Sequence, residues 1–168
     1  MVAWAWAKRL QNNMFLGTHC NRFDAKGRIS IPAPFRAVLK KHAISGQSLM
    51  ILRPSHLHPC LEAWTSERFF SQTTPLAEYD PFSEEHEDLS TSLYAEAYPL
   101  DSDKEGRIII PESLQRHANL EKEVTFMGLG RIFQIWHPEE ALKRQKEAHL
   151  RAKELTLRNR KASEGKEA

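Results

Sequence analysis

Short stretches of alternating polar and apolar residues run through the chain, a pattern typical of half-buried β-strands. Arg28-Ile29-Ser30-Ile31 shows this alternation most clearly. Strands are predicted over residues 14–23, 28–31, 48–52, 60–64, 98–102, 107–110, 124–127 and 132–136. Residues 24–27 and 103–106 are predicted to form tight turns, the first as the tip of a β-hairpin, and residues 128–131 to form a second hairpin.

Helical spacing appears after the prolines that end the strands. Phe35, Val38 and Leu39 fall at i, i+3 and i+4 and follow Pro32 and Pro34, which predicts a short amphipathic helix. Further helices are predicted over residues 66–73 and 83–98, around Leu114 and Ala118, and from residue 137 onward. Together with the strands, these helices predict a mixed α+β fold that is mainly β.

The C-terminal region is highly charged. Lys and Arg dominate residues 143–161, while Leu142, Leu150, Leu155 and Leu157 give only a thin apolar stripe. Two interpretations stay open: a solvated charged helix face, or an additional contact with DNA or with another subunit. Residues 162–168 are expected to be disordered.

A nine-residue pattern occurs twice in the chain. Asp24-Ala25-Lys26-Gly27-Arg28-Ile29-Ser30-Ile31-Pro32 returns as Asp103-Lys104-Glu105-Gly106-Arg107-Ile108-Ile109-Ile110-Pro111. The later segments Leu61-Glu62-Ala63-Trp64 and Phe133-Gln134-Ile135-Trp136 also correspond. Such self-similarity implies one supersecondary unit used twice, each half needing the other to bury its apolar face.

The repeat suggests a division of the chain. Residues 1–13 are expected to form a disordered N-terminal extension, 18–66 the first unit, 67–96 a helical connector, 97–140 the second unit and 141–168 a basic helix and tail.

Composition narrows the class of protein. A mean hydropathy of −0.56 and the lack of an apolar run of about 20 residues exclude a membrane span. Cys20 and Cys60 cannot make a disulfide framework, which suits a reducing compartment, so the protein is expected to be cytoplasmic. The net charge of +2 is weak, so binding to nucleic acid would require local clustering of charge or several copies of the chain.

The sequence offers little for an enzyme. It has no Gly-rich phosphate loop, no G-x-S-x-G and no H-E-x-x-H. His56, His58 and Cys60 could contact a metal, but no second cluster supplies further ligands, so neither a metal nor a cofactor is predicted. Asp24 and Asp103 each lie beside a basic residue, which should lower their pKa values rather than create a shared proton.

The first turn is a candidate for DNA binding. Arg28, with Lys26 and Arg22, would form a basic prong whose guanidinium suits phosphate oxygens or guanine edges, and two-stranded ribbons fit the major groove. In the alternative interpretation, Asp24 pairs with Arg28 only to close the hairpin, and Gly27 serves the turn. Both interpretations can hold at once.

The two turns differ in charge. The first is surrounded by Arg22, Lys26, Arg28, Arg36, Lys40 and Lys41, opposed by Asp24 alone. Around the second motif (Asp103, Gly106 and Arg107), the residues Asp101, Asp103, Glu105 and Glu112 offset Lys104, Arg107 and Arg116. The first turn is therefore expected to make the main DNA contacts, and the second to be structural or to contact a neighbouring subunit.

Two D-x-x-G-R turns, each followed by I-x-I-P, together with Met14-Phe15-Leu16-Gly17, closely resemble the MraZ family of bacterial transcriptional regulators, built from two AbrB-like units. The resemblance covers residues 14–147. It implies a swapped-hairpin β-barrel, assembly into a ring, and binding of double-stranded DNA at direct repeats upstream of the protein's own operon for cell division and cell-wall synthesis. It also implies association with the nucleoid, with Arg28 essential for DNA binding and Asp24 holding its geometry.

Two features depart from the family pattern. Residues 1–13 precede the usual start at Met14, which suggests an upstream start codon or a disordered extension, and Glu105 beside Arg107 argues against a direct DNA contact in the second turn. Two other functions compete with DNA binding. The first is an AbrB-like protein-interaction or assembly module whose basic tail docks an acidic partner, and the second, ranked last, is a small barrel enzyme using Asp24 and Asp103.

Overall fold

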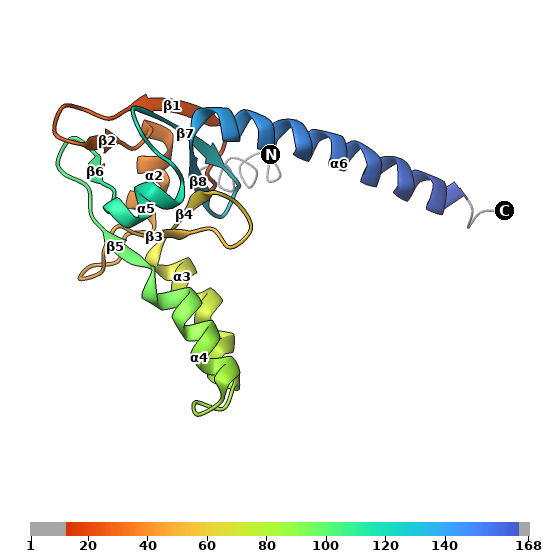
Figure 1. The fold of residues 1–168 in the computed structure, drawn as a ribbon, viewed down its shortest axis with the longest axis horizontal. Coiled ribbons are helices and arrows are strands. Elements are labelled where there is room, and N and C mark those ends of the chain that lie inside the picture. The colour runs from red at the N-terminus through yellow and green to blue at the C-terminus, as the bar shows by residue number, and fades with distance from the viewer. Residues whose placement is uncertain (1–12, 165–168) are drawn as a thin grey trace, which may run out of the picture.

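Eight strands and several helices make up residues 13–164, the part of the chain that the structure, a computed structural model, describes. The strands are β1 (Thr18–Arg22), β2 (Arg28–Ser30), β3 (Met50–Pro54), β4 (Cys60–Trp64), β5 (Tyr98–Leu100), β6 (Arg107–Ile109), β7 (Glu123–Gly128) and β8 (Phe133–Trp136). The α-helices are α2 (Ala33–Lys41), α3 (Ser66–Thr73), α4 (Glu84–Ser90), α5 (Glu112–His117) and α6 (Pro138–Glu164), with a 3-10 helix η1 (Thr74–Glu78) and a π-helical segment η2 (Thr91–Ala95). The predicted mixed α+β class is confirmed (Figure 1).

The strands of the two repeats interleave. A six-stranded antiparallel sheet has the order β1-β7-β8-β4-β3-β5, and β2 pairs with β6 in a separate two-stranded sheet. Each strand of the first repeat thus pairs with a strand of the second: β1 with β7, β2 with β6, β3 with β5 and β4 with β8. The six-stranded sheet keeps β1 and β5 as edges, so the swapped-hairpin barrel stays a prediction.

One core serves both repeats. Phe15 and Phe35 of the first repeat pack against Phe133 of the second, with ring centroids 5.0 Å from Phe133 in both cases. Ile29, Ile31, Ile108 and Ile110 are buried in the same core. Burying such a side chain is worth about 1.5–3 kcal/mol, so separating the halves would remove part of the hydrophobic stabilisation of each. The two repeats thus bury their apolar faces in a shared core, and the need of each half for the other stays a prediction.

Most predicted elements are present, with three corrections. The hairpin expected at residues 24–27 is wrong, because β1 and β2 enter different sheets and each pairs with the other repeat. The strand predicted over 14–23 begins only at Thr18, because Gly17 adopts φ +88° and Phe15 forms an isolated bridge to Gly130. The helix predicted over 83–98 is α-helical only to Ser90 and continues as η2.

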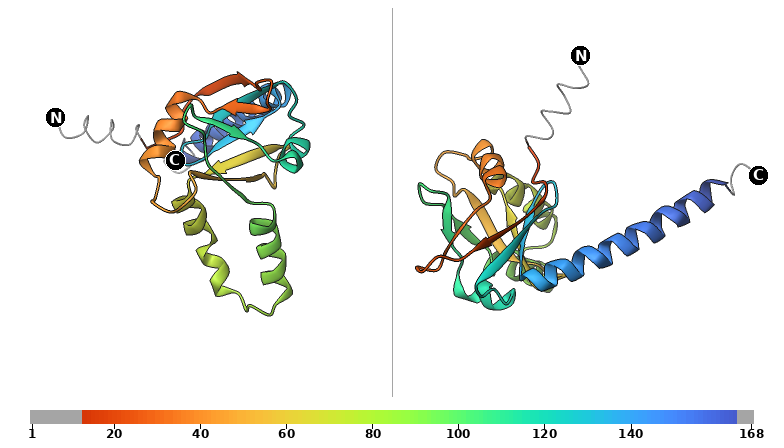
Figure 2. Two further views of the ribbon diagram at one scale, coloured as in Figure 1. Left: turned by 90° about the vertical axis from the view of Figure 1, so that its left-hand side faces the viewer. Right: turned by 90° about the horizontal axis from the view of Figure 1, so that it is seen from above.

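Within the described part of the chain, two helical segments project from the sheets (Figures 1 and 2). The first is an arm, which we define as residues 66–95 (α3, η1, α4 and η2). The second is α6, whose start packs through Ala141 against Trp136 and whose Gln145 donates to the Thr18 hydroxyl at 3.0 Å. Among the described residues, no helix combines the length and apolar character needed to cross a membrane.

The predicted terminal segments are only partly described. Residues 1–12 of the expected N-terminal extension and residues 165–168 of the expected disordered tail lie outside the described residues. Residues 162–164 belong to α6, which corrects that part of the tail prediction.

Candidate nucleic-acid interface

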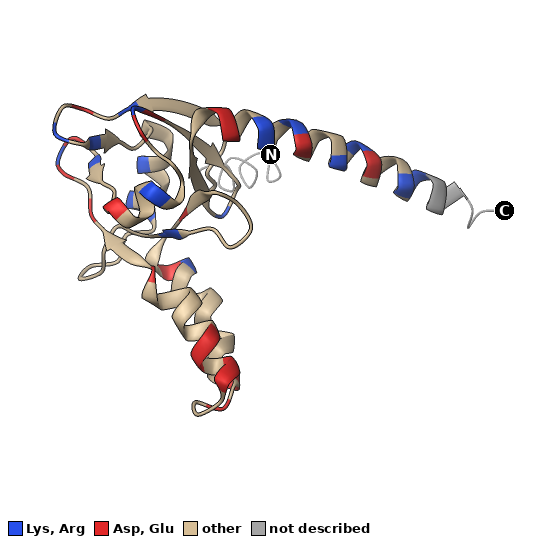
Figure 3. Ribbon diagram, viewed as in Figure 1, with Lys and Arg blue, Asp and Glu red and all other residues tan. Residues whose placement is uncertain are grey.

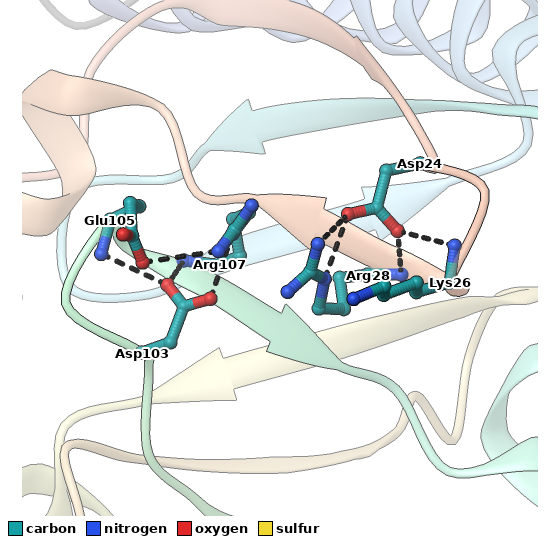
Figure 4. A network of polar contacts seen from close by, with 6 residues as sticks. All are labelled: Asp24, Lys26, Arg28, Asp103, Glu105 and Arg107. Atoms are coloured by element: carbon teal, nitrogen blue, oxygen red, sulfur yellow. Dashed lines mark hydrogen bonds and ion pairs between the residues drawn. The ribbon is translucent and has the colours of Figure 1, made fainter.

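The first turn is organised by the carboxylate of Asp24 (Figure 4). Its Oδ1 accepts the backbone N–H groups of Lys26 and Arg28, each at 2.9 Å. Its Oδ2 contacts Arg28 Nε at 2.8 Å and Nη2 at 2.7 Å. Gly27, at φ +73°, donates its N–H to the Asp24 carbonyl at 3.0 Å. One side chain therefore fixes both the turn and the direction of its arginine, so the interpretation that Asp24 pairs with Arg28 is confirmed.

The second turn repeats this geometry and adds a second carboxylate. Asp103 Oδ1 accepts the N–H groups of Glu105 and Arg107, and its Oδ2 accepts Arg107 Nε at 2.7 Å. In addition, Arg107 Nη2 donates to Glu105 Oε2 at 3.1 Å. Arg107 is thus held by two carboxylates, whereas Arg28 is held by one.

These contacts keep both aspartates ionised. The backbone and side-chain hydrogen bonds from Arg28 lower the pKa of Asp24 to about 2. Hydrogen bonds from Arg107, the backbone one first, likewise lower the pKa of Asp103. The hydrogen bond that Arg107 donates to Asp103 raises the pKa of Arg107, and the charge of Asp24 contributes in the same direction. The prediction that pairing lowers these carboxyl pKa values, rather than making them share a proton, is confirmed.

The structure brings the two motifs onto one surface. In the β2–β6 pair, Arg28 lies opposite Ile109, Ile29 opposite Ile108 and Ser30 opposite Arg107. Ile29 and Ile108 are buried, so the alternate residues Arg28, Ser30, Arg107 and Ile109 share the outer face. We call this face the ribbon face. Ile109 on it is 63% exposed.

The sequence did not predict this pairing, because each predicted turn joins strands of its own repeat, the first as the tip of a hairpin. One signal in the sequence could have indicated the pairing of β2 with β6. The I-x-I segments occupy the same position in both repeats, as expected of two strands that pair about a two-fold axis.

The other predicted DNA-binding residues of the first turn lie around this face. Lys26 is exposed and forms no ion pair with any of the described residues. Arg22, at the end of β1, forms an ion pair with Glu123 of β7 at 2.5 Å. Lys26 therefore offers its charge fully, whereas the charge of Arg22 is partly compensated.

Arg36 belongs to the surroundings of the second turn rather than the first. Its side chain lies over Gly106, where an added Cβ would collide with Arg36 Cδ. Its Nη1 donates to the Ile31 carbonyl at 2.9 Å, and the Ile31 N–H donates to the Gly106 carbonyl at 3.0 Å. The interleaving of the repeats explains this exchange, since each strand after a turn crosses to the other half.

The segment around His56 is a connection between β3 and β4. His56 contacts Arg53 and Ser92, while the His58 ring lies 5.6 Å from that of Trp136. Burial raises the pKa of the Cys60 thiol to about 12. Within residues 13–164, no group of three or more His, Cys, Asp or Glu side chains is placed to hold a metal ion.

Comparison with known proteins identifies the family. The family model described as MraZ protein, antitoxin-like, matches residues 14–91 and 93–160. A Gluconobacter oxydans protein named transcriptional regulator MraZ is 67% identical over 151 residues, which are 90% of this chain and 92% of that relative. Relatives of the same name from Gluconacetobacter diazotrophicus and Rickettsia rickettsii are 54% identical (86% of this chain, 92% of the relative) and 40% identical (88% and 98%). The chain therefore belongs to the MraZ family of transcriptional regulators.

Proposed function

We propose that the protein regulates transcription by binding double-stranded DNA with the ribbon face. The observation that carries this proposal is the placement of two rigidly held arginines on one exposed surface of a two-stranded ribbon. A ribbon of this kind fits the major groove, where arginine recognises guanine and apolar side chains contact the thymine methyl group. Arg28 and Ile109 on this face, and Lys26 beside it, are the residues best suited to these contacts.

Arg28 is the principal contact in this proposal. A guanidinium has five N–H donors, and Asp24 contacts only Nε and Nη2. Nη1 has no hydrogen bond or ion pair with the residues that the structure describes, so it can donate to a phosphate or a base edge. Because Asp24 also fixes the turn, it holds the donor in place before DNA arrives, which lowers the entropic cost of binding.

The target in this proposal is a set of direct repeats upstream of the protein's own operon, bound by a ring of subunits at the nucleoid. A single chain with a net charge of +2 attracts DNA weakly. Several copies that engage spaced repeats at once gain effective concentration without any new contact. The names of the relatives support transcriptional regulation, whereas the direct repeats, the ring and the nucleoid are what the resemblance to the MraZ family implies.

The experiment is a binding titration of the purified protein with the DNA segment upstream of its own gene, compared with a scrambled fragment. We expect preferential binding to the upstream fragment, with log affinity falling by about 0.9 per decade of salt for each phosphate neutralised. Equal binding to both fragments, or no dependence on salt, would contradict the proposal. Partner capture that survives nuclease treatment, without DNA binding, would favour the protein-interaction module instead.

A further inference from the structure

The arm carries an exposed apolar groove. Phe70 of α3, Leu76 and Ala77 of η1, and Tyr94 of η2 line it together with polar residues, and its volume is about 400 Å³. Phe70 and Tyr94 are 52% and 42% exposed. At the tip of the arm, Phe82 is 97% exposed. Aromatic groups left this accessible mark a surface suited to contact with another macromolecule.

The same arm is strongly acidic. Residues 69–95 contain six carboxylates and neither Lys nor Arg, the six being Glu78, Asp80, Glu84, Glu85, Glu87 and Asp88. All six are exposed, and none forms an ion pair with the described residues. Figure 3 shows this concentration of acidic residues toward the tip of the arm. An occupant of the groove should therefore be basic and partly apolar.

The projecting part of α6 has this character. Lys146, Leu150, Lys153 and Leu157 follow one another at spacings of 4, 3 and 4 residues, which places them on one helix face. Leu150 and Leu157 are 64% and 49% exposed, and every side chain from residue 149 to 160 is exposed. Most helices in proteins are stabilised by packing of one face, so this segment lacks the surface that would normally stabilise it.

The arm and α6 of one chain cannot meet. They leave the sheets in different directions, and α6, with 27 residues, extends about 40 Å along its axis (Figures 1 and 2). Contact between them therefore requires two copies of the chain. Such a contact joins different surfaces head to tail, and repetition of it produces a ring when the rotation closes.

We propose that the face of α6 formed by Lys146, Leu150, Lys153 and Leu157 docks in the arm groove of a second copy. The leucines cover the aromatic groove, and the lysines lie among the carboxylates beside it. This inference deepens the self-association in the proposed function and rests on that part of it, but it is independent of DNA binding. It gives the ring two complementary surfaces, neither of which includes the ribbon face.

Charge reversal in the absence of DNA tests this contact. The arm variant is Glu78→Lys with Glu87→Lys, and the helix variant is Lys146→Glu with Lys153→Glu. Because like charges oppose each other across the contact, we expect each variant alone to raise the apparent dissociation constant of assembly by more than about tenfold, measured by light scattering. Arg116→Glu, which reverses a charge on α5, outside both the arm and α6, should leave the assembly unchanged.

Mixing the two variants gives the decisive result. In a mixture, the negative α6 of the helix variant can dock on the positive arm of the arm variant. The native, positive α6 of the arm variant can likewise dock on the native acidic arm of the helix variant. We therefore expect the mass of the assembly to return. Circular dichroism and thermal unfolding of each variant check that the fold is intact.

Three results would overturn the proposal: a wild-type chain that is monomeric, variants that keep the wild-type mass, or loss of mass that mixing does not restore. If α6 binds DNA instead of a second copy, the helix variant should bind DNA more weakly while its assembly keeps the wild-type mass. Failure of the DNA proposal is seen separately, because Arg28→Ala should weaken DNA binding while the protein keeps its mass.

Discussion

The two turns share one skeleton and differ in the residues beside their arginines. In both, an aspartate accepts two backbone N–H groups and a guanidinium. In the first, the third residue is Lys26, which adds a positive charge, whereas in the second it is Glu105, which binds Arg107. The shared hydrogen bonds of the aspartate therefore serve the fold. The third residue of the turn, Lys26 or Glu105, sets how strongly each copy attracts a polyanion.

The largest expected effect separates the two arginines. Arg28→Ala should lower the affinity for the upstream fragment about 100-fold, since one good arginine contact is worth about 1–3 kcal/mol and is repeated in every subunit. Arg107→Ala should lower it less than about threefold, because two carboxylates already engage that side chain. Fluorescence anisotropy at a fixed salt concentration measures both.

Arg131→Ala is the matched control for this pair. It also removes one arginine, but at the end of β7 that lies away from the turns, so it should leave the affinity for DNA unchanged. Equal losses for Arg28→Ala and Arg107→Ala would show that the two turns contribute alike.

The sequence predicted those features that depend on nearby residues. β4 (Cys60–Trp64) and α3 (Ser66–Thr73) have the predicted bounds, because a mainly apolar segment is followed directly by a helix whose start is capped. Thr65 provides that cap, its hydroxyl accepting the Arg68 N–H at 3.3 Å. The bonding of Asp24 to Arg28 was likewise available from their spacing.

Features that depend on long-range pairing were not predicted. Alternation identifies Arg28-Ile29-Ser30 as a strand but does not say which strand it pairs with, and its partner lies about 80 residues away in the other repeat. The ribbon face and the position of Arg36 over Gly106 both follow from that pairing. They required the structure for this reason.

A second difference between the turns concerns their glycines. Gly27 and Gly106 both have positive φ, but a Cβ at Gly27 meets nothing within 4 Å, whereas at Gly106 it would collide with Arg36. Gly27→Ala should lower the free energy of unfolding by about 1 kcal/mol through backbone strain alone. Gly106→Ala should cost about 2 kcal/mol, because displacing Arg36 also breaks its hydrogen bond to Ile31.

Urea unfolding of the two alanine variants measures this difference. Adding Arg36→Ala to both removes the obstacle over Gly106, so the two glycine substitutions should then cost nearly the same. A difference that persists in the Arg36→Ala background would show that the contact with Arg36 is not its cause.

Exchanging the third residues of the two turns should produce a smaller effect on DNA binding. Lys26→Glu gives the first turn a carboxylate like that of Glu105 in the second, and we expect about fivefold weaker binding because Arg28 gains a competing carboxylate.

Glu105→Lys releases Arg107 from one of its two carboxylates and should strengthen binding about threefold. The salt dependence should become steeper by about 0.9 for each phosphate newly neutralised. A Glu105→Lys protein with the wild-type salt dependence would place the second turn away from DNA.

The smallest expected effect is the dependence of stability on pH. Because the folded protein holds the pKa of Asp24 at about 2, below its ordinary value of 3.8, ionised Asp24 stabilises the fold. This stabilisation is complete above about pH 4 and disappears as the pH falls through 3.8 toward 2.

Asp24→Asn should therefore destabilise the protein at pH 7. The difference in the free energy of unfolding between this variant and the wild type should shrink as the pH falls over that interval. Urea unfolding between pH 2 and pH 7 measures the difference, with Asp80→Asn at the arm tip as the control. A difference that stays constant across this range would mean that the Asp24 carboxylate contributes through its shape and hydrogen bonds alone, without the charge that distinguishes it from asparagine.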